Sequence, residues 1–109
     1  MIIHSEALDL QRTTEQDLAF VLAIEQSEVN RVYIGQWSKE EHTTAIQDPD
    51  ILHLTIWDNS GKRVGYIIVT GLQDTHLTVC IKRIVIHSKG LGYGKLSLRL
   101  LSDWIFRHT

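Results

Sequence analysis

The residues best suited to chemistry lie together in one short segment: Lys89, Gly90, Gly92, Gly94 and Lys95. Glycine has no side chain, so the backbone of this segment can approach a ligand closely. A helix is expected to begin near Tyr93, and the first N–H groups of a helix have no hydrogen-bond partner within it. The helix dipole adds about half a positive charge at that end. The segment is therefore predicted to bind a phosphate or pyrophosphate. A tight turn between a strand and a helix is the simpler alternative.

Two other glycine-rich motifs fit this segment less well. A P-loop has four residues between its first glycine and a Gly-Lys-Ser/Thr sequence, whereas Lys95 is followed by Leu96. A dinucleotide-binding fingerprint follows the first strand of a parallel βαβ unit, whereas this segment follows several expected strands and lies near the end of the sequence. A generic phosphate-binding α+β domain stays open as a further interpretation.

The histidines and the single cysteine do not form a metal-binding pattern. The six histidines are scattered: His4, His42, His53, His76, His87 and His108. Zinc needs three or four convergent ligands, so no metal site is predicted. His87 adjoins the glycine segment and is interpreted as a polar strand end. Cys80 has apolar neighbours in an expected strand and is interpreted as a small buried hydrophobic residue rather than a nucleophile.

Hydrophobic periodicity predicts the elements that would position the glycine segment. Strands are expected at residues 8–12, 51–57, 64–70 and 76–86, and helices at about 14–28, 38–46 and 93–107. Two capping boxes are predicted at helix starts, Thr13 with Gln16 and Ser38 with Glu41. The second helix should end before Pro49, because the residue before proline avoids the helical region.

The last three strands are expected to be neighbours in one antiparallel sheet. The turn cluster at residues 58–61 predicts a hairpin between the first two of them. In the third, the apolar alternation slips near Lys82 and Arg83, which predicts a β-bulge. The final helix should bury an apolar stripe: Leu96, Leu100, Leu101, Trp104 and Ile105. Helices packed on such a sheet define an α+β layered domain.

Length and composition exclude several functional classes. The chain has 109 residues, enough for one domain, so residues 1–109 are treated as a single unit. The net charge of −2 gives no basic footprint for nucleic acid. No stretch approaches the ~20 apolar residues of a membrane helix, and the first residues do not resemble a signal peptide. One cysteine excludes an internal disulfide, which favours a cytoplasmic location.

The glycine segment resembles the coenzyme A pyrophosphate loop of the GNAT N-acetyltransferases, usually written Gln/Arg-x-x-Gly-x-Gly/Ala. Lys89 stands where the family prefers Arg or Gln, and Gly92 and Gly94 match its two glycines. Other parts resemble the family's opening, its hairpin into the third strand and its bulged fourth strand: residues 12–18, 61–66 and 83–86. The stretch 37–42 resembles the branch that acetylates aminoglycosides and ribosomal proteins. The resemblance covers about residues 8–106.

The resemblance implies a role for each part of the expected site. Acetyl-coenzyme A would be the co-substrate, and no metal would be needed. The pantetheine arm would hydrogen-bond to the backbone of the fourth strand at Ile84, Val85 and Ile86. The pyrophosphate would lie on the loop and helix start: Lys89, Gly90, Leu91, Gly92, Tyr93, Gly94 and Lys95. Candidates for contacts with the acceptor amine are Glu25, Glu28, Tyr33 and Trp37, although a solvated helix end and a packed loop are the simpler interpretations.

The resemblance also implies a mostly antiparallel sheet with helices on both faces, truncated after the helix that follows the coenzyme A loop. The family's usual thiolate acid is a tyrosine beyond the next strand, so no catalytic residue is assigned. The fourth strand would then be an open apolar edge, and a homodimer joined through it is expected to cover it.

Two functions follow as hypotheses. The first is an N-acetyltransferase that transfers acetyl from acetyl-coenzyme A to a primary amine of a small molecule or peptide by direct attack. The second is a non-catalytic coenzyme A-binding or assembly module with the same fold.

Overall fold

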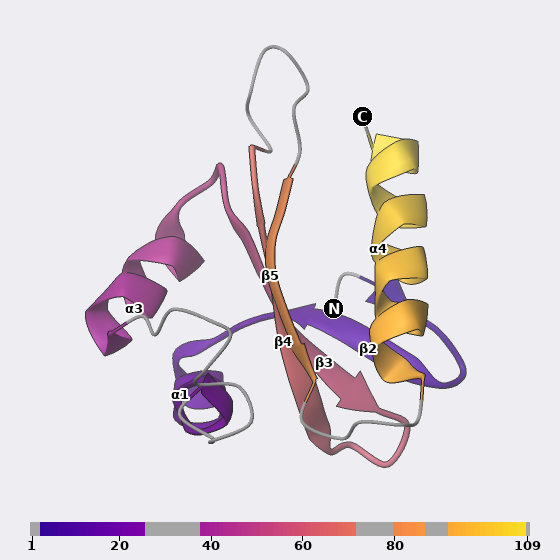
Figure 1. Cartoon of the computed structure of the whole chain (residues 1–109), viewed down its shortest axis with the longest axis horizontal. Helices are drawn as coiled ribbons and strands as arrows, with labels where there is room; N and C mark the ends of the chain where they lie inside the picture. The colour runs from indigo at the N-terminus through magenta and orange to yellow at the C-terminus, as the bar shows by residue number, and fades with distance from the viewer. Residues whose placement is uncertain (1–2, 26–37, 72–79, 87–91, 109) are drawn as a thin grey trace.

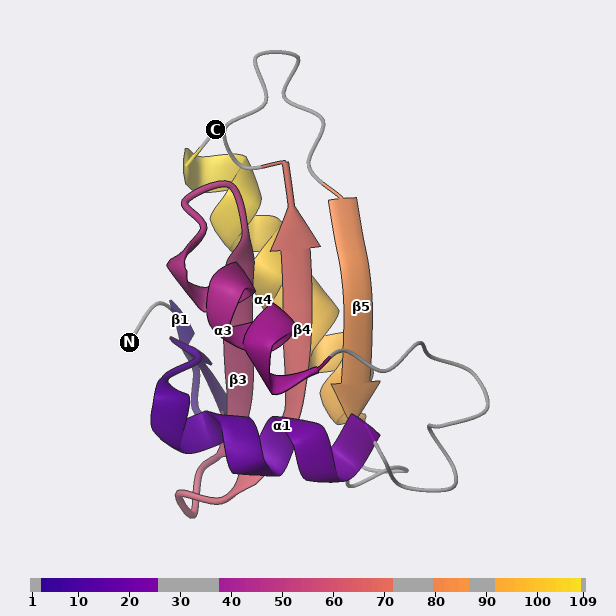
Figure 2. The ribbon, with the colours of Figure 1, turned by 90° about the vertical axis from the view of Figure 1, so that its left-hand side faces the viewer.

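Five strands form one antiparallel sheet whose spatial order follows the chain, from β1 to β5 (Figures 1 and 2). The computed structural model describes residues 3–25, 38–71, 80–86 and 92–108. The strands are β1 Ile3–His4, β2 Leu8–Arg12, β3 Leu52–Asp58, β4 Arg63–Thr70 and β5 Cys80–Ile86. The helices are the 3-10 turn η1 Glu15–Asp17, α1 Leu18–Glu25, α3 Lys39–Gln47 and α4 Tyr93–His108. The predicted α+β architecture is confirmed.

Helices lie on both faces of the sheet, as predicted (Figures 1 and 2). Helix α4 packs on one face, where the buried residues of the core come mainly from alternate positions of the strands: Leu8, Leu10, Leu52, Leu54, Ile56, Ile67 and Val69. Leu101 of α4 completes this core and is fully buried. Burying such a side chain contributes roughly 1.5–3 kcal/mol, so the predicted stripe of α4 is a main stabilising element of this face.

Helices α1 and α3 cover the opposite face (Figure 2). Val21 and Ile24 of α1 pack there against Tyr66 and Ile68 of β4 and Val85 of β5. Adjacent residues of a strand point to opposite faces, so β4 serves both cores at once. The same alternation places His53 and Thr55 of β3 under α3 and η1, which makes this second core partly polar.

The first helix begins differently from the prediction. The carboxylate of Asp17 accepts hydrogen bonds from the backbone N–H of Thr14 at 2.8 Å and from its hydroxyl at 3.0 Å. Thr14 has the extended backbone of an N-cap. The predicted pair of Thr13 with Gln16 is wrong, because Thr13 is 3 % exposed and its hydroxyl contacts His53 in the sheet instead. The end of the predicted helix, residues 26–28, lies outside the described residues.

The second helix begins and ends as predicted. Ser38 accepts a hydrogen bond from the backbone N–H of Glu41 at 3.1 Å, and the Glu41 carboxylate accepts one from the N–H of Ser38 at 3.0 Å. Helix α3 ends at Gln47 and Asp48 is extended, directly before Pro49. The short strand β1 was not predicted; it pairs Ile3 with Leu10 of β2.

The predicted bulge of the last strand is confirmed. Arg83 of β5 pairs with Ile68 of β4, and Ile81 pairs with the next residue, Val69, so Lys82 is the extra residue. A second irregularity lies between β3 and β4, where the pairing also skips one residue. Bulges bend a strand and change the direction of its side chains. The bulge in β5 therefore lies just before the stretch that the sequence assigns to the cofactor.

The final helix is confirmed over Tyr93–His108. Its partly buried residues that pack against the core include Leu96, Leu100, Trp104 and Ile105. None of the helices in the described part of the chain is long and apolar enough to cross a membrane.

Candidate functional site

The end of β5 and the start of α4 form the centre of the candidate site. The carbonyl of Gly92 accepts the first bond of the helix from the N–H of Leu96 at 3.1 Å. The N–H groups of Tyr93, Gly94 and Lys95 come before this bond, so they belong to the donors that a helix start leaves without helical partners. Their position at the positive end of a 16-residue helix gives the chemistry of an anion site. Lys89, Gly90 and Leu91 lie outside the described residues.

Gly92 and Gly94, at the junction of β5 and α4, have different structural roles. Gly92 has a φ angle of +74°, a left-handed conformation that glycine adopts without strain. Among the described residues, no atom beyond its chain neighbours lies within 4 Å of where its Cβ would be, so this part of the structure leaves room for a ligand there. A Cβ on Gly94 would lie 3.5 Å from Cγ1 of Ile86, which is an ordinary contact. Gly94 therefore brings the helix start close to the end of β5.

The strand residues predicted to bind pantetheine lie at the edge of the sheet. Ile84 and Ile86 pack against the core under α4, whereas Val85 is 4 % exposed and belongs to the core under α1. β5 is last in the strand order, so among the described strands its outer edge has no partner. Backbone groups of successive residues point alternately to the two edges of a strand, so alternate residues of the stretch 84–86 face outward and could pair with an extended ligand.

On the face of α1 and α3, the structure describes only part of the predicted acceptor site. Glu28, Tyr33 and Trp37 lie outside the described residues, and Glu25 is the last residue of α1, with its side chain also outside the description. A hollow of about 340 Å³ lies beside α3. The described residues that line it are Glu40, Glu41, Thr44, Ala45 and Ile51. These residues were not predicted, because they take part only through the packing of α3 beside the start of β3.

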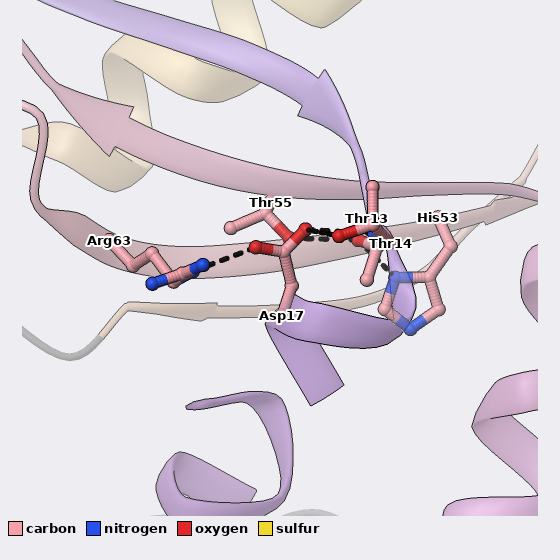
Figure 3. A network of polar contacts seen from close by, with 6 residues as sticks. All are labelled: Thr13, Thr14, Asp17, His53, Thr55 and Arg63. Carbon is pink, nitrogen blue, oxygen red and sulfur yellow. Dashed lines mark hydrogen bonds and ion pairs between the residues drawn. The ribbon is translucent and has the colours of Figure 1, made fainter. Parts of the chain in front are cut away.

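A buried polar network lies under α3 and η1 (Figure 3). The hydroxyls of Thr13 and Thr55 are 2.9 Å apart, and Nδ1 of His53 lies 2.8 Å from Oγ1 of Thr13. Nε2 of His53 lies 3.1 Å from Nδ1 of His42. The sequence gives one signal for this network, namely the alternation that points His53 and Thr55 to the same face. It gives no signal for His42, which comes from a different element.

A second polar group joins η1 to β4 (Figure 3). Nε of Arg63 donates to Oδ1 of Asp17 at 2.7 Å, and Asp17 is 4 % exposed. The guanidinium of Arg63 also lies 4.4 Å from the ring centre of Trp57. A carboxylate this deeply buried needs a positive partner, so the pair attaches η1 and the start of α1 to the sheet.

No metal centre is formed by the described part of the chain, in which no three or more His, Cys, Asp and Glu side chains gather as ligands. His42 and His53 are the histidines brought together, and they contact each other and a hydroxyl. His76 and His87 lie outside the described residues.

Comparison with known proteins gives a likeness in structure alone. No protein-family model and no curated protein matches the sequence. A spermidine N-acetyltransferase from Vibrio cholerae, solved in complex with coenzyme A and spermine, superposes with a TM-score of 0.80 at 17 % identity over 94 % of this chain and 66 % of that chain. A chimera of the Vibrio cholerae enzyme with hSSAT gives 0.78 at 18 % identity, over 94 % and 64 %.

A domain from Methanocaldococcus jannaschii gives a TM-score of 0.74 at 20 % identity, over 92 % of this chain and 70 % of that one. At these identities the likeness establishes the fold. This chain spans about two thirds of the length of these proteins, with 64 % for the chimera.

Proposed function

We propose that this chain, which has the fold of the GNAT N-acetyltransferases, binds acetyl-coenzyme A at the junction of β5 and α4 and presents its acetyl group to an amine. The single observation that carries the proposal is the helix start at Gly92. There a left-handed glycine opens space beside the first N–H groups of α4. A pyrophosphate fits such a place because the donors are fixed and the helix dipole favours negative charge.

The bulged edge strand supports the same proposal. The outward backbone groups within the stretch Ile84, Val85 and Ile86, which belong to alternate residues, could pair with the amide groups of a pantetheine arm, as an added strand pairs with a sheet edge. The bulge at Lys82 bends β5 directly before this stretch. An arm that runs along this edge from the start of α4 would reach the bulge at its far end. There its acetyl group could turn toward the face of the sheet on which α3 and the hollow lie.

The hollow beside α3 supports an amine acceptor. Glu40 and Glu41 provide negative charge at the hollow, while Ala45 and Ile51 provide apolar contacts. An aliphatic chain with a cationic end would match both features. Solved proteins with this fold are named for acting on spermidine, and one is bound to spermine, so these two amines are the first acceptors to test. In the proposed reaction the nitrogen of the uncharged amine forms a bond to the thioester carbon and the carbon–sulfur bond breaks. The amine loses a proton, and the departing thiolate gains one and leaves as the free thiol of coenzyme A.

Isothermal titration of acetyl-coenzyme A into the purified chain tests the cofactor site. We expect binding by the natural chain and a loss of at least 10-fold in affinity in Gly92→Glu, because the new side chain would fill the space beside the helix start and repel the pyrophosphate. The matched control is Gly61→Glu. Gly61 also has a positive φ of +85° and open space around its Cβ position, but it lies in the turn between β3 and β4.

The control separates backbone strain from ligand contact. Both substitutions impose the strain of a side chain at positive φ, so a loss of affinity confined to Gly92→Glu assigns the cofactor to the start of α4. Equal affinity in all three chains, or no binding by a folded natural chain, would contradict the proposal.

A non-catalytic coenzyme A-binding or assembly module is the second candidate function. It is favoured by the position of β5 at the edge of the described sheet, where the strand of another chain could pair with it. An acetyl-transfer assay with spermidine and spermine distinguishes the two functions. Cofactor binding without transfer would select the second. With transfer, Glu40→Gln should raise KM for the polyamine more than it lowers kcat.

A further inference from the structure

Two histidines share a buried hydrogen bond between α3 and the sheet. Nδ1 of His42 on α3 lies 3.1 Å from Nε2 of His53 on β3. His42 is 0 % exposed and His53 is 3 % exposed. Nδ1 of His53 continues the chain to Oγ1 of Thr13 at 2.8 Å, which in turn lies 2.9 Å from Oγ1 of Thr55 (Figure 3). Both ring nitrogens of His53 are therefore engaged.

This chain of contacts limits the number of protons that the pair can hold. A hydrogen bond between two imidazole nitrogens needs one N–H and one bare nitrogen. A threonine hydroxyl can donate or accept, so Thr13 and Thr55 can reverse their direction and let His53 carry N–H on both nitrogens. The folded pair can thus take up one extra proton. A second extra proton would place N–H against N–H at the contact between His42 and His53.

The ring of Tyr66 favours His53 as the site of the one extra proton. His53 stacks on Tyr66 with ring centres 5.8 Å apart and an interplanar angle of 19°. His42 meets Tyr66 edge-on, at 6.1 Å and 88°. A cation over the face of an aromatic ring is attracted by the negative charge of that face. The singly protonated pair is therefore compatible with the folded packing.

Charged groups on the surrounding elements do not relieve the conflict that a second proton creates. The described ones are Glu15, Asp17, Lys39, Glu40, Glu41, Asp48, Asp50, Asp58, Arg63, Lys82 and Arg83. Asp17 and Arg63 pair with each other, and Glu41 accepts the N–H of Ser38 in the helix cap. Arg83 lies on β5 opposite Ile68 of β4. The residues 18–24 of α1 include no charged side chain. Wherever these charges lie, two N–H groups still face each other at the contact between the two rings.

We propose that His42 and His53 form a proton-operated latch that holds α3 against the sheet. With no extra proton, or with one, the contact is intact and α3 is closed. The second proton breaks the contact and releases α3. The open form binds two extra protons and the closed form at most one. The equilibrium constant for closing α3 onto the sheet therefore falls by up to 10-fold for each unit by which the pH is lowered.

The latch would regulate the acceptor side of the proposed enzyme, and in this respect it rests on the proposed function. Glu40, Thr44 and Ala45 of α3 line the hollow proposed for the amine. If α3 leaves the sheet, that wall of the hollow is lost. The latch itself is a property of the folded chain and needs neither cofactor nor acceptor.

Hydrogen exchange of the α3 amides between pH 7 and pH 5 tests the latch on the natural chain. After correction for intrinsic exchange, we expect protection of α3 to fall at least 10-fold while protection of β4 changes little. His42→Gln should abolish this dependence, because an amide can accept from His53 but cannot take up a proton. The matched control is His4→Gln, which removes an exposed histidine that contacts Asp9 on β2 and should behave like the natural chain.

A second measurement keeps the test decisive if His42→Gln does not fold. Imidazole nitrogen shifts of the natural chain report the protons on each ring directly. The latch predicts one imidazolium in the pair for as long as α3 is protected. Two imidazolium rings under a protected α3, or protection of α3 that does not depend on pH, would overturn it. Acetyl-coenzyme A is absent throughout, so a failure here leaves the proposed function untouched, and a failure to bind the cofactor leaves the latch untouched.

Discussion

Gly65 of β4 lies close against the backbone of β5. A Cβ at this position would lie 2.4 Å from the carbonyl oxygen of Val85 and 3.0 Å from Cδ1 of Ile86. The first of these neighbours is backbone, so it cannot turn away as a flexible side chain would. We predict that Gly65→Ala lowers the free energy of unfolding by about 2 kcal/mol, the usual range for overpacking. Urea denaturation measures it.

Gly94→Ala is the natural control for this prediction. Its Cβ would meet Ile86 at an ordinary 3.5 Å, and alanine favours a helix over glycine by about 1 kcal/mol. Gly94→Ala should therefore leave stability unchanged or raise it. Equal stability of Gly65→Ala and the natural chain would show that β5 can move away from β4 without cost.

Ser97 has a buried hydroxyl for which the described residues offer no hydrogen-bond partner. The residue is fully buried on α4, and no described group lies within hydrogen-bond distance of its Oγ. We predict that Ser97→Ala raises the free energy of unfolding by about 1–2 kcal/mol, because a buried polar group is removed and alanine is the better helix former. Ser102→Ala on the exposed side of the same helix should give only the propensity part, about 0.5 kcal/mol. Thermal unfolding of the two variants compares them, and an equal gain would count against the buried hydroxyl.

At the scale of elements, the hairpin between β3 and β4 depends on the carboxylate of Asp58. Oδ1 of Asp58 accepts from the hydroxyl of Ser60 at 2.7 Å and from the backbone N–H groups of Ser60 and Lys62. The hydrogen bond from the Ser60 hydroxyl, then the one from the Lys62 backbone, lowers the pKa of Asp58 below its ordinary value of 3.8. A lowered pKa means that the stabilisation is present above pH 3.8 and is lost as the pH falls through the folded-state pKa.

We therefore predict that the amides of this hairpin lose protection below about pH 4. Asp58→Asn should remove this acid dependence, since asparagine can hold the same turn but does not titrate in this range. Amide exchange between pH 2 and pH 5 measures the effect. The α3 experiment runs between pH 5 and pH 7, so the two dependences can be told apart. A hairpin whose protection does not change with acid in the natural chain would contradict the prediction.

The elements that could be predicted are those fixed by local patterns. The capping box of Ser38 and Glu41, the bulge at Lys82 and the stripe of α4 each depend on residues close in sequence, and each is confirmed. Strand β1 has only two residues, too few to show a period. The cap at Thr13 was misplaced because its hydroxyl contacts His53, 40 positions away, and a local rule does not include such a competitor.

The candidate site divides in the same way. Its glycine segment is contiguous in the sequence and could therefore be predicted as a motif. The hollow beside α3 is lined by residues between 40 and 51 that only tertiary packing brings together. The buried histidine pair was missed for the same reason. His42 and His53 come from a helix and a strand, and their meeting depends on how α3 lies on the sheet.

At the scale of the whole molecule, the outer edge of β5 has no neighbouring strand among the described residues. Ile81 on this strand is 40 % exposed, and an exposed apolar edge strand favours pairing with another chain. We predict a homodimer joined through β5, which light scattering would detect as twice the monomer mass. Ile81→Lys should shift the mass toward the monomer, whereas Phe106→Lys, at an 88 % exposed position on α4, should not. A monomeric mass at high concentration would rule the dimer out.

The strand order also determines when the strands can pair and when apolar surface stays exposed during synthesis of the chain. Because β1 to β5 are neighbours in the order in which they leave the ribosome, each new strand can pair with the one made before it. The apolar face beneath α4 is different, since the helix that covers it follows all five strands in the chain and has 16 residues. At 5–20 residues per second its translation takes roughly one to three seconds. During this interval a nascent sheet exposes its leucines, and a chaperone that shields them would matter most then.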